Sequence, residues 1–236
     1  MVKFNLKTQI MKNFFFKKNL KLIHKLFFKS ITKIYTPIKI KTYLKKNKIK
    51  KLHLGSGRNL KINWLNSDLE PKSLNAIYLD ASKKFPFENN LIDYIYSEHM
   101  IEHLDYKSGL NLMCESYRVL KPGGKIRITT PDLDVLYEIY KNKDNFYDDY
   151  IAWSSKENFL FGNSIEVFNN FFQNWGHKFI YNKNFLKKNL QKIGFKDLNF
   201  YKLNESNDFN LKNLENESRL PKNFLQIESF TIEGSK

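Results

Sequence analysis

The chain has 236 residues, 42% of them hydrophobic and 16% aromatic, which suits one good-sized domain and excludes wholesale disorder. Its single cysteine excludes a disulfide framework and a cysteine-rich metal site, and its apolar runs are too short for a membrane span or a secretory signal. The net charge of +16 lies at the N-terminus, because residues 1–50 contain fifteen lysines and no acidic residue. The other 186 residues carry 25 basic and 24 acidic side chains and are nearly neutral.

The first 48 residues are predicted to form a basic arm. Within it, residues 12–35 have the pattern of an amphipathic helix, which Pro37 is expected to end because proline lacks a backbone N–H. Such a helix can lie on an anionic membrane surface. Two alternatives stay open, in which its apolar side packs on the domain or its lysines contact RNA. The apolar side consists of Phe16, Leu20, Ile23, Phe27, Ile31 and Ile34.

Residues 49–236 are predicted to form an α/β domain with a parallel sheet. Its first strand runs into Gly55-Ser56-Gly57, and Asp68 and Asp80 end the next two, where ligands bind in open α/β sheets. Eleven residues separate Gly57 from Asp68, and twelve separate Asp68 from Asp80, so full crossover helices hardly fit. The predicted strands are 50–54, 62–67, 76–79, 92–97 and 125–130, with a helix at 107–120.

The C-terminal part is expected to complete the sheet. A helix at 184–193 is closed by Gly194, and strands at 195–203 and 224–232 are expected to form a hairpin. Before them, the aromatic-rich segment 137–180 lacks strand alternation and is predicted to form a lid or an acceptor pocket.

Several motifs in residues 52–133 together resemble the class I S-adenosylmethionine-dependent methyltransferases. They are Leu52–Gly57, Asp68, Leu79–Ala81 with Phe85-Pro86-Phe87, Ile92–Ser97, and the two segments most like the methyltransferase type 11 group, Ser97–Leu104 and Arg118–Gly124. The resemblance is closest to a bacterial subgroup linked with surface-polysaccharide biosynthesis, which residues 175–181 also resemble. It implies a three-layer α/β/α, Rossmann-like fold. One departure is Asn59, which stands where the family has its third glycine, although asparagine tolerates a left-handed backbone.

The resemblance implies S-adenosylmethionine as the cofactor and assigns its site. The backbone of Gly55, Ser56 and Gly57 approaches the methionine part, and Ala81 offers its N–H to the adenine ring. Asp68 accepts hydrogen bonds from the ribose and Asp80 from the adenine amine. In a rival assignment Asp80 takes the ribose, and in a structural one both aspartates only cap turns. Glu98 is expected to face the space between cofactor and acceptor.

Two histidines are predicted to serve catalysis. His177 titrates near neutral pH and is the candidate to take a proton from a hydroxyl acceptor, although methyl transfer can also proceed without a base. His99 is expected to line the active-site cleft. Residues 99–103 also spell H-x-x-E-H, a zinc-protease pattern, but no third ligand is evident in the sequence nearby, so no metal site is predicted.

The predicted function is methylation of a hydroxyl or carboxyl of a surface-glycan or lipid-linked sugar. The predicted location is cytoplasmic, with peripheral attachment to the inner membrane face through residues 12–35. One alternative is an RNA methyltransferase, which the near-neutral domain makes less favoured, since nucleic-acid grip depends on basic charge. Another is a non-catalytic interaction module. The sequence specifies neither the acceptor nor the oligomeric state.

Overall fold

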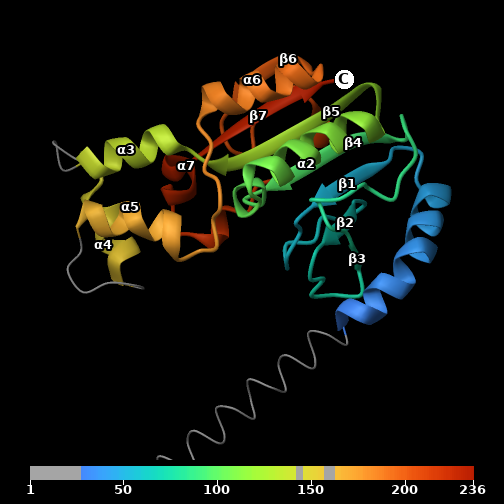
Figure 1. The fold of residues 1–236 in the computed structure, drawn as a ribbon, viewed down its shortest axis with the longest axis horizontal. Coiled ribbons are helices and arrows are strands. Elements are labelled where there is room, and N and C mark those ends of the chain that lie inside the picture. Colours follow the sequence, from blue (N-terminus) through green and yellow to red (C-terminus); the bar gives the residue numbers. More distant parts are fainter. Residues whose placement is uncertain (1–27, 142–145, 157–162) are drawn as a thin grey trace, which may run out of the picture.

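The computed structural model describes residues 28–141, 146–156 and 163–236. Its centre is a seven-stranded sheet in the order β3-β2-β1-β4-β5-β7-β6 (Figure 1). Strands β1 to β5 pair in parallel, whereas β7 is antiparallel to its neighbours β5 and β6. The strands are β1 (Lys51–Leu54), β2 (Leu65–Asp68), β3 (Ala76–Tyr78), β4 (Ile92–Glu98), β5 (Leu120–Pro131), β6 (Lys196–Tyr201) and β7 (Ser229–Ser235).

Two layers cover the faces of this sheet. Helices α2 (Tyr106–Val119) and α6 (Lys183–Ile193) lie on one face, where their leucines join the main core with Ile95 and Ile126 (Figure 1). On the other face, Tyr96 packs with Trp64 and with Leu211 and Leu214 from the connection between β6 and β7. The predicted Rossmann-like α/β sheet is therefore confirmed.

The sequence located most of the elements around the sheet. Residues 55–64 and 69–75 contain no helix, as their short lengths predicted. Helix α6 ends at Gly194, whose φ of 119° is a left-handed conformation that glycine adopts without strain. Strands β6 and β7 form the expected closing hairpin.

The expectation that Pro37 ends the N-terminal helix was wrong. Residues 28–46 form one continuous helix along the β2–β3 side of the sheet (Figure 1). An internal proline removes one helical hydrogen bond, at a cost of about 3 kcal/mol. Contacts with the domain on both sides of the proline offset this cost, because Thr36 Oγ1 accepts a hydrogen bond from the Tyr78 N–H and Ile40 is buried in the core. The predicted helical residues 12–27 lie outside the described residues.

The predicted strand 224–232 was wrong in its first half. Residues Phe224–Glu228 form helix α7, and strand β7 begins only at Ser229. Burial explains the difference, because Leu225 and Glu228 both face inward from one helical turn. The Tyr150 hydroxyl donates a hydrogen bond of 2.5 Å to Glu228 Oε2, which fixes this turn.

The predicted lid segment is helical and has a small core of its own. Helices α3 (Leu133–Lys141), α4 (Asp148–Lys156) and α5 (Ser164–Gln173) gather next to α7 (Figure 1). Their buried side chains include Leu136, Ile139, Tyr150, Val167 and Phe171. In the part of the chain that the structure describes, no helix has the length and apolar character needed to cross a membrane.

Candidate active site

The loop after β1 brings backbone close to the strand ends. Gly55 and Gly57 have φ values of 66° and 52°, which disfavour side chains. A Cβ at Gly55 would lie 2.2 Å from Met100 Cγ, so this glycine lets the β1 and β4 loops meet. A Cβ at Gly57 would meet nothing within 4 Å, and this backbone is open to a ligand.

A cavity of about 330 Å³ lies at the carboxyl ends of β1 to β4. Four residues predicted to bind the cofactor line it, namely Gly55, Asp68, Asp80 and Ala81. Ligands of open α/β sheets bind at this edge, and the volume is in the range of small-molecule sites. The cavity is also lined by Leu69, Leu79, Ser82, Met100, His103, Leu104, Asp105, Ser108 and Lys178.

Both aspartates of this cavity already accept hydrogen bonds from the protein. Asp68 accepts from the Gly57 N–H at 2.8 Å and the Glu70 N–H at 2.7 Å. Asp80 accepts from the Ser82 N–H and hydroxyl. Burial alone would raise the pKa of Asp80, but Ser82 and the nearby Lys83 lower it, so the carboxylate is charged. Each carboxylate keeps lone pairs for a ligand, and the rival assignments of ribose and adenine stay open.

Three other residues predicted to bind the cofactor, Ser56, Gly57 and Glu98, do not line this cavity. Ser56 is buried, and its hydroxyl has no hydrogen-bond partner in the described part of the chain. Glu98 does not face the space between two ligands as expected. It accepts hydrogen bonds from Asn59 Nδ2, Tyr96 Oη and the Asn216 N–H, so it ties the β1 loop to the connection after β6.

A second cavity, of about 650 Å³, lies beside the first and is partly walled by the lid segment. Its aromatic wall is formed by Trp153, Phe171 and Trp175. His103 lines both cavities, so the two cavities adjoin at this residue. The remaining lining residues are His99, His177, Ser218, Arg219, Leu220, Pro221 and Glu228.

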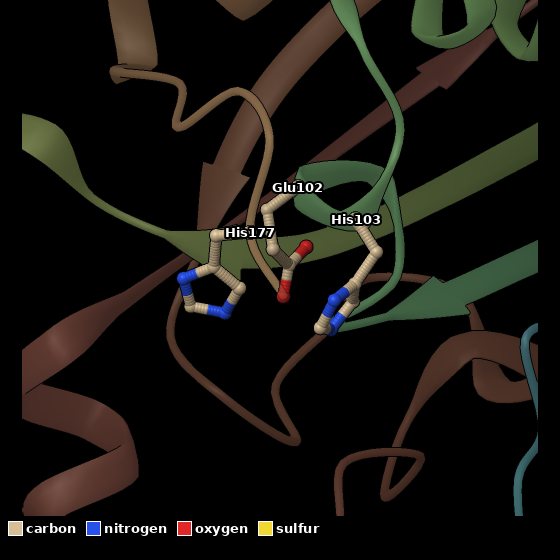
Figure 2. A group of neighbouring side chains, drawn as sticks. All are labelled: Glu102, His103 and His177. Atoms are coloured by element: carbon tan, nitrogen blue, oxygen red, sulfur yellow. The ribbon is translucent and has the colours of Figure 1, made fainter. Parts of the chain in front are cut away.

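Both predicted catalytic histidines line this second cavity, and Glu102 lies between them. The Glu102 carboxylate points between the rings of His177 and His103 (Figure 2). His99 Nδ1 is 3.4 Å from Glu102 Oε1, and its Nε2 is 2.8 Å from Ser229 Oγ. His177 reaches this group because the Lys178 N–H donates to the Glu102 carbonyl at 2.7 Å.

The H-x-x-E-H residues do not share one helix. His99 has a φ of 45°, and only Ile101–His103 form a single 3-10 turn. The turn therefore lacks the i, i+4 histidine pair of a helical zinc-protease site.

Burial and charge set the protonation of this group. Burial would raise the pKa of Glu102, but His99 and His103 outweigh it and lower the pKa, so the carboxylate is ionised. Burial lowers the pKa of His177, against the opposing charge of Glu102, and keeps the ring neutral near pH 7.

Sequence reasoning singled out His99 and His177 but missed Glu102 and His103. The signal was present in the H-x-x-E-H motif of residues 99–103. It was set aside because no third metal ligand was evident in the sequence nearby. His177 lies 74 positions beyond His103 in the chain, so only the fold brings the two rings to 5.0 Å.

The smaller cavity suits S-adenosylmethionine. This cofactor offers ribose hydroxyls and an adenine amine as donors, and the cavity presents the two acceptor carboxylates Asp68 and Asp80. The glycine loop at Gly55 brings backbone to the edge of this cavity.

The comparisons with known proteins agree on methyltransferases. Residues 52–128 match the family model described as a methyltransferase domain. No curated protein matches the chain. Among solved structures, a SAM-dependent methyltransferase from Archaeoglobus fulgidus is 17% identical with a TM-score of 0.49, over 92% of this chain and 99% of that chain.

Two other solved structures are similar at comparable levels. Phosphoethanolamine N-methyltransferase 2 from Haemonchus contortus, in complex with S-adenosyl-L-methionine, is 18% identical with a TM-score of 0.47 over 80% of this chain. The match spans 48% of that chain, so this chain covers about half the length of that relative. A possible histamine N-methyltransferase from Thermotoga maritima is 15% identical with a TM-score of 0.46, over 83% and 86% of the two chains.

The family match and the geometry fall on the same part of the chain. Of the residues that line the smaller cavity, all but Lys178 lie within the matched residues 52–128. The match therefore identifies residues 52–128 as a methyltransferase domain, and nearly all the residues of the cavity that suits S-adenosylmethionine belong to it.

Proposed function

We propose that the enzyme methylates a hydroxyl or carboxyl oxygen of a glycan or lipid-linked sugar bound in the larger cavity. The observation that carries this proposal is the wall that the two cavities share at His103. A cofactor in the smaller cavity and an acceptor in the larger one can bring their reacting atoms together there.

The walls of the larger cavity favour a sugar as the acceptor. Trp153 and Trp175 offer flat apolar surfaces against which the C–H face of a sugar ring can pack. Arg219, Ser218 and Glu228 offer donors and acceptors for its hydroxyl or carboxyl groups.

The chain's contribution to the reaction is positioning and handling of one proton. When bound, S-adenosylmethionine supplies a methyl group carried on a positively charged sulfur. As the new C–O bond forms, the S–C bond breaks and its electron pair stays on the sulfur. The Asp68 and Asp80 cavity would orient that methyl group toward His103. An acceptor hydroxyl has to lose its proton, and His177 faces the same cavity to receive it. His99 would position Glu102 and need not touch the acceptor.

Transfer of a labelled methyl group to simple saccharides tests the proposal. The acceptors are the methyl glycosides of hexoses and hexuronic acids, and the products are O-methyl ethers or esters. Trp175→Ala is expected to raise the KM for the saccharide ~10-fold, a loss of about 1.4 kcal/mol of packing. The affinity for the cofactor stays unchanged. The matched control is Phe172→Ala, an exposed aromatic of α5 outside the lining.

The outcomes separate the substrate class from the enzyme class. If saccharides remain unmethylated while RNA is methylated by the same preparation, the glycan proposal fails. If Trp175→Ala and Phe172→Ala change the saccharide KM equally, the larger cavity is not the acceptor site.

We also propose that the N-terminal helix docks the enzyme on an anionic membrane surface. In the described part, Thr32, Thr36 and Ile40 are buried against the domain. Ile34 and Ile38 lie on a different side of the helix and are 71% and 62% exposed. They continue the apolar side that the sequence predicts for residues 12–35, while each of the many lysines near an anionic surface contributes about 1 kcal/mol.

A further inference from the structure

Three side chains meet at the wall between the two cavities. Glu102, His103 and His177 each offer an oxygen or nitrogen atom, and these atoms lie within 4.8 Å of one another. The carboxylate stands between the two rings (Figure 2). They come from the 3-10 turn after β4 and from the loop before α6, which the Lys178 N–H and the Glu102 carbonyl hold together.

The Glu102 carboxylate is fully buried and only partly satisfied. Its Oε2 accepts a hydrogen bond of 3.1 Å from Thr130 Oγ1. Its Oε1 has no hydrogen-bond partner in the described part of the chain, and His99 Nδ1 lies 3.4 Å from it. A buried charge without full pairing is costly, so this oxygen is suited to a cation.

The two rings are oriented as ligands of a cation. His177 Nδ1 is 2.8 Å from the Phe171 carbonyl, and His103 Nδ1 is 3.3 Å from the Gly176 carbonyl. A carbonyl can only accept, so each Nδ1 carries the hydrogen of its bond, and Nε2 is the ring nitrogen left to contact a cation. Histidines that bind metal ions are commonly fixed by such a bond from the other ring nitrogen.

We propose that Glu102, His103 and His177 bind a divalent first-row metal ion such as Zn²⁺. Two imidazole nitrogens and one carboxylate oxygen are a ligand set typical of catalytic zinc, with a further position left open. With metal–ligand bonds of about 2.1 Å in a tetrahedral site, the ligand atoms would lie about 3.5 Å from one another. Since these atoms now lie within 4.8 Å of one another, the side chains would have to move closer by about 1 Å when the ion binds.

The open position would face the acceptor, because His103 and His177 line the larger cavity. This step rests on the proposed function. A cation there lowers the pKa of an acceptor hydroxyl, and the released proton passes to water in the cavity. His177 then acts as a ligand and no longer as the group that receives the proton.

Metal binding to the full-length protein tests this directly. The protein is stripped with a chelator, then titrated with Zn²⁺ by calorimetry and with Co²⁺ by visible absorption. The expected result is one ion per chain with micromolar affinity and the absorption bands of tetrahedral Co²⁺. Glu102→Gln and His177→Ala are each expected to weaken binding ~100-fold or more. Glu138→Gln, an exposed carboxylate on α3, is the control.

Independent readouts keep the outcomes distinct. Cofactor binding by calorimetry shows whether each variant is folded. If Glu102→Gln, a change at a buried residue, does not fold, His177→Ala alone tests the metal site. Zn²⁺ binding equal in His177→Ala and Glu138→Gln overturns the metal site. Methyl transfer that survives chelation also overturns its catalytic role, while the methyltransferase itself stands.

Discussion

Residue 55 must be glycine because the loops after β1 and β4 touch there. In Gly55→Ala the new Cβ would overlap Met100, which lines the cofactor cavity. We expect this variant to bind S-adenosylmethionine at least ~10-fold more weakly, about 1.4 kcal/mol, by calorimetry. Gly123→Ala is the control, because Gly123 also has a positive φ, its Cβ enters open space and it does not line the cavity. Met100→Ala in the Gly55→Ala background should restore part of the affinity. Equal losses in the two glycine variants would contradict this.

His53 makes the fold sensitive to mild acid. Burial lowers the pKa of His53 to about 4, partly offset by Asn66, whose Oδ1 is 3.0 Å from Nδ1. The unfolded histidine has a pKa of about 6.5, so between pH 6.5 and 4 the unfolded chain binds a proton that the folded chain excludes. Stability from this group is thus present above pH 6.5 and lost as the pH falls.

Urea unfolding at pH 7 and pH 5 measures this loss. The free energy of unfolding should fall by about 2 kcal/mol more in the natural protein than in His53→Gln. An equal fall in both would show that His53 is protonated in the folded state.

At the residue scale the sequence predicted the lining of the smaller cavity better than that of the larger one. Gly55, Asp68, Asp80 and Ala81 are separated by short connections at the ends of adjacent strands, so their order along the chain implied their proximity. Glu102 and His177 meet only through a backbone hydrogen bond between distant segments. No local pattern encodes that contact.

Among the elements, β5 and the connection after β6 are joined by a buried ion network. Arg127 is fully buried and bonds Glu215 at two positions and Glu233 at one. Arg127→Met should lower the free energy of unfolding by about 3–5 kcal/mol, because it leaves two carboxylates buried without a cation. Chemical denaturation measures this. Adding Glu215→Gln and Glu233→Gln should recover part of the loss, and a triple variant less stable than Arg127→Met would contradict the explanation.

The elements that were predicted correctly have strong local signals. Helix α6 has a capping asparagine, Asn182, and a terminal glycine, and β4 alternates between the two cores. The errors at Pro37 and at 224–228 have one cause. Contacts with distant residues, Tyr78 in the first case and Tyr150 in the second, overrode the local preference.

For the whole molecule, strand order and short connections were enough to predict the Rossmann-like sheet. They did not predict which side of the N-terminal helix packs against the domain. Ile34, from the apolar side predicted by periodicity, is exposed, as is Ile38 beyond the predicted range. The domain instead contacts the side that carries Thr32 and Thr36. Thr36 contacts strand β3 through a hydrogen bond from the Tyr78 N–H, and a polar contact of this kind leaves no hydrophobic pattern in the sequence. Hydrophobic periodicity therefore cannot reveal the packed side of the helix.

Vesicle co-sedimentation tests the membrane surface. The protein should pellet with vesicles of phosphatidylcholine and phosphatidylglycerol, but not with phosphatidylcholine alone. Ile34→Asn with Ile38→Asn should weaken this binding ~10-fold or more, because apolar burial in the interface is lost. The control is Ile165→Asn, because Ile165 is an exposed apolar residue of α5, away from the N-terminal helix. Equal binding of both variants, or binding to poly(U) RNA with no vesicle binding, would contradict the membrane surface.

The central claim is that the strand-end cavity holds S-adenosylmethionine, and calorimetric titration of the cofactor and of S-adenosylhomocysteine into the full-length protein tests it most directly. We expect one site per chain with a Kd of about 1–10 μM for both ligands. Asp80→Ala should weaken both at least ~10-fold, because a hydrogen-bonded carboxylate of the cavity is lost. Glu88→Ala, an exposed carboxylate outside the lining, should not. Folded protein that binds neither ligand, or Asp80→Ala that binds as well as the natural protein, would contradict the account.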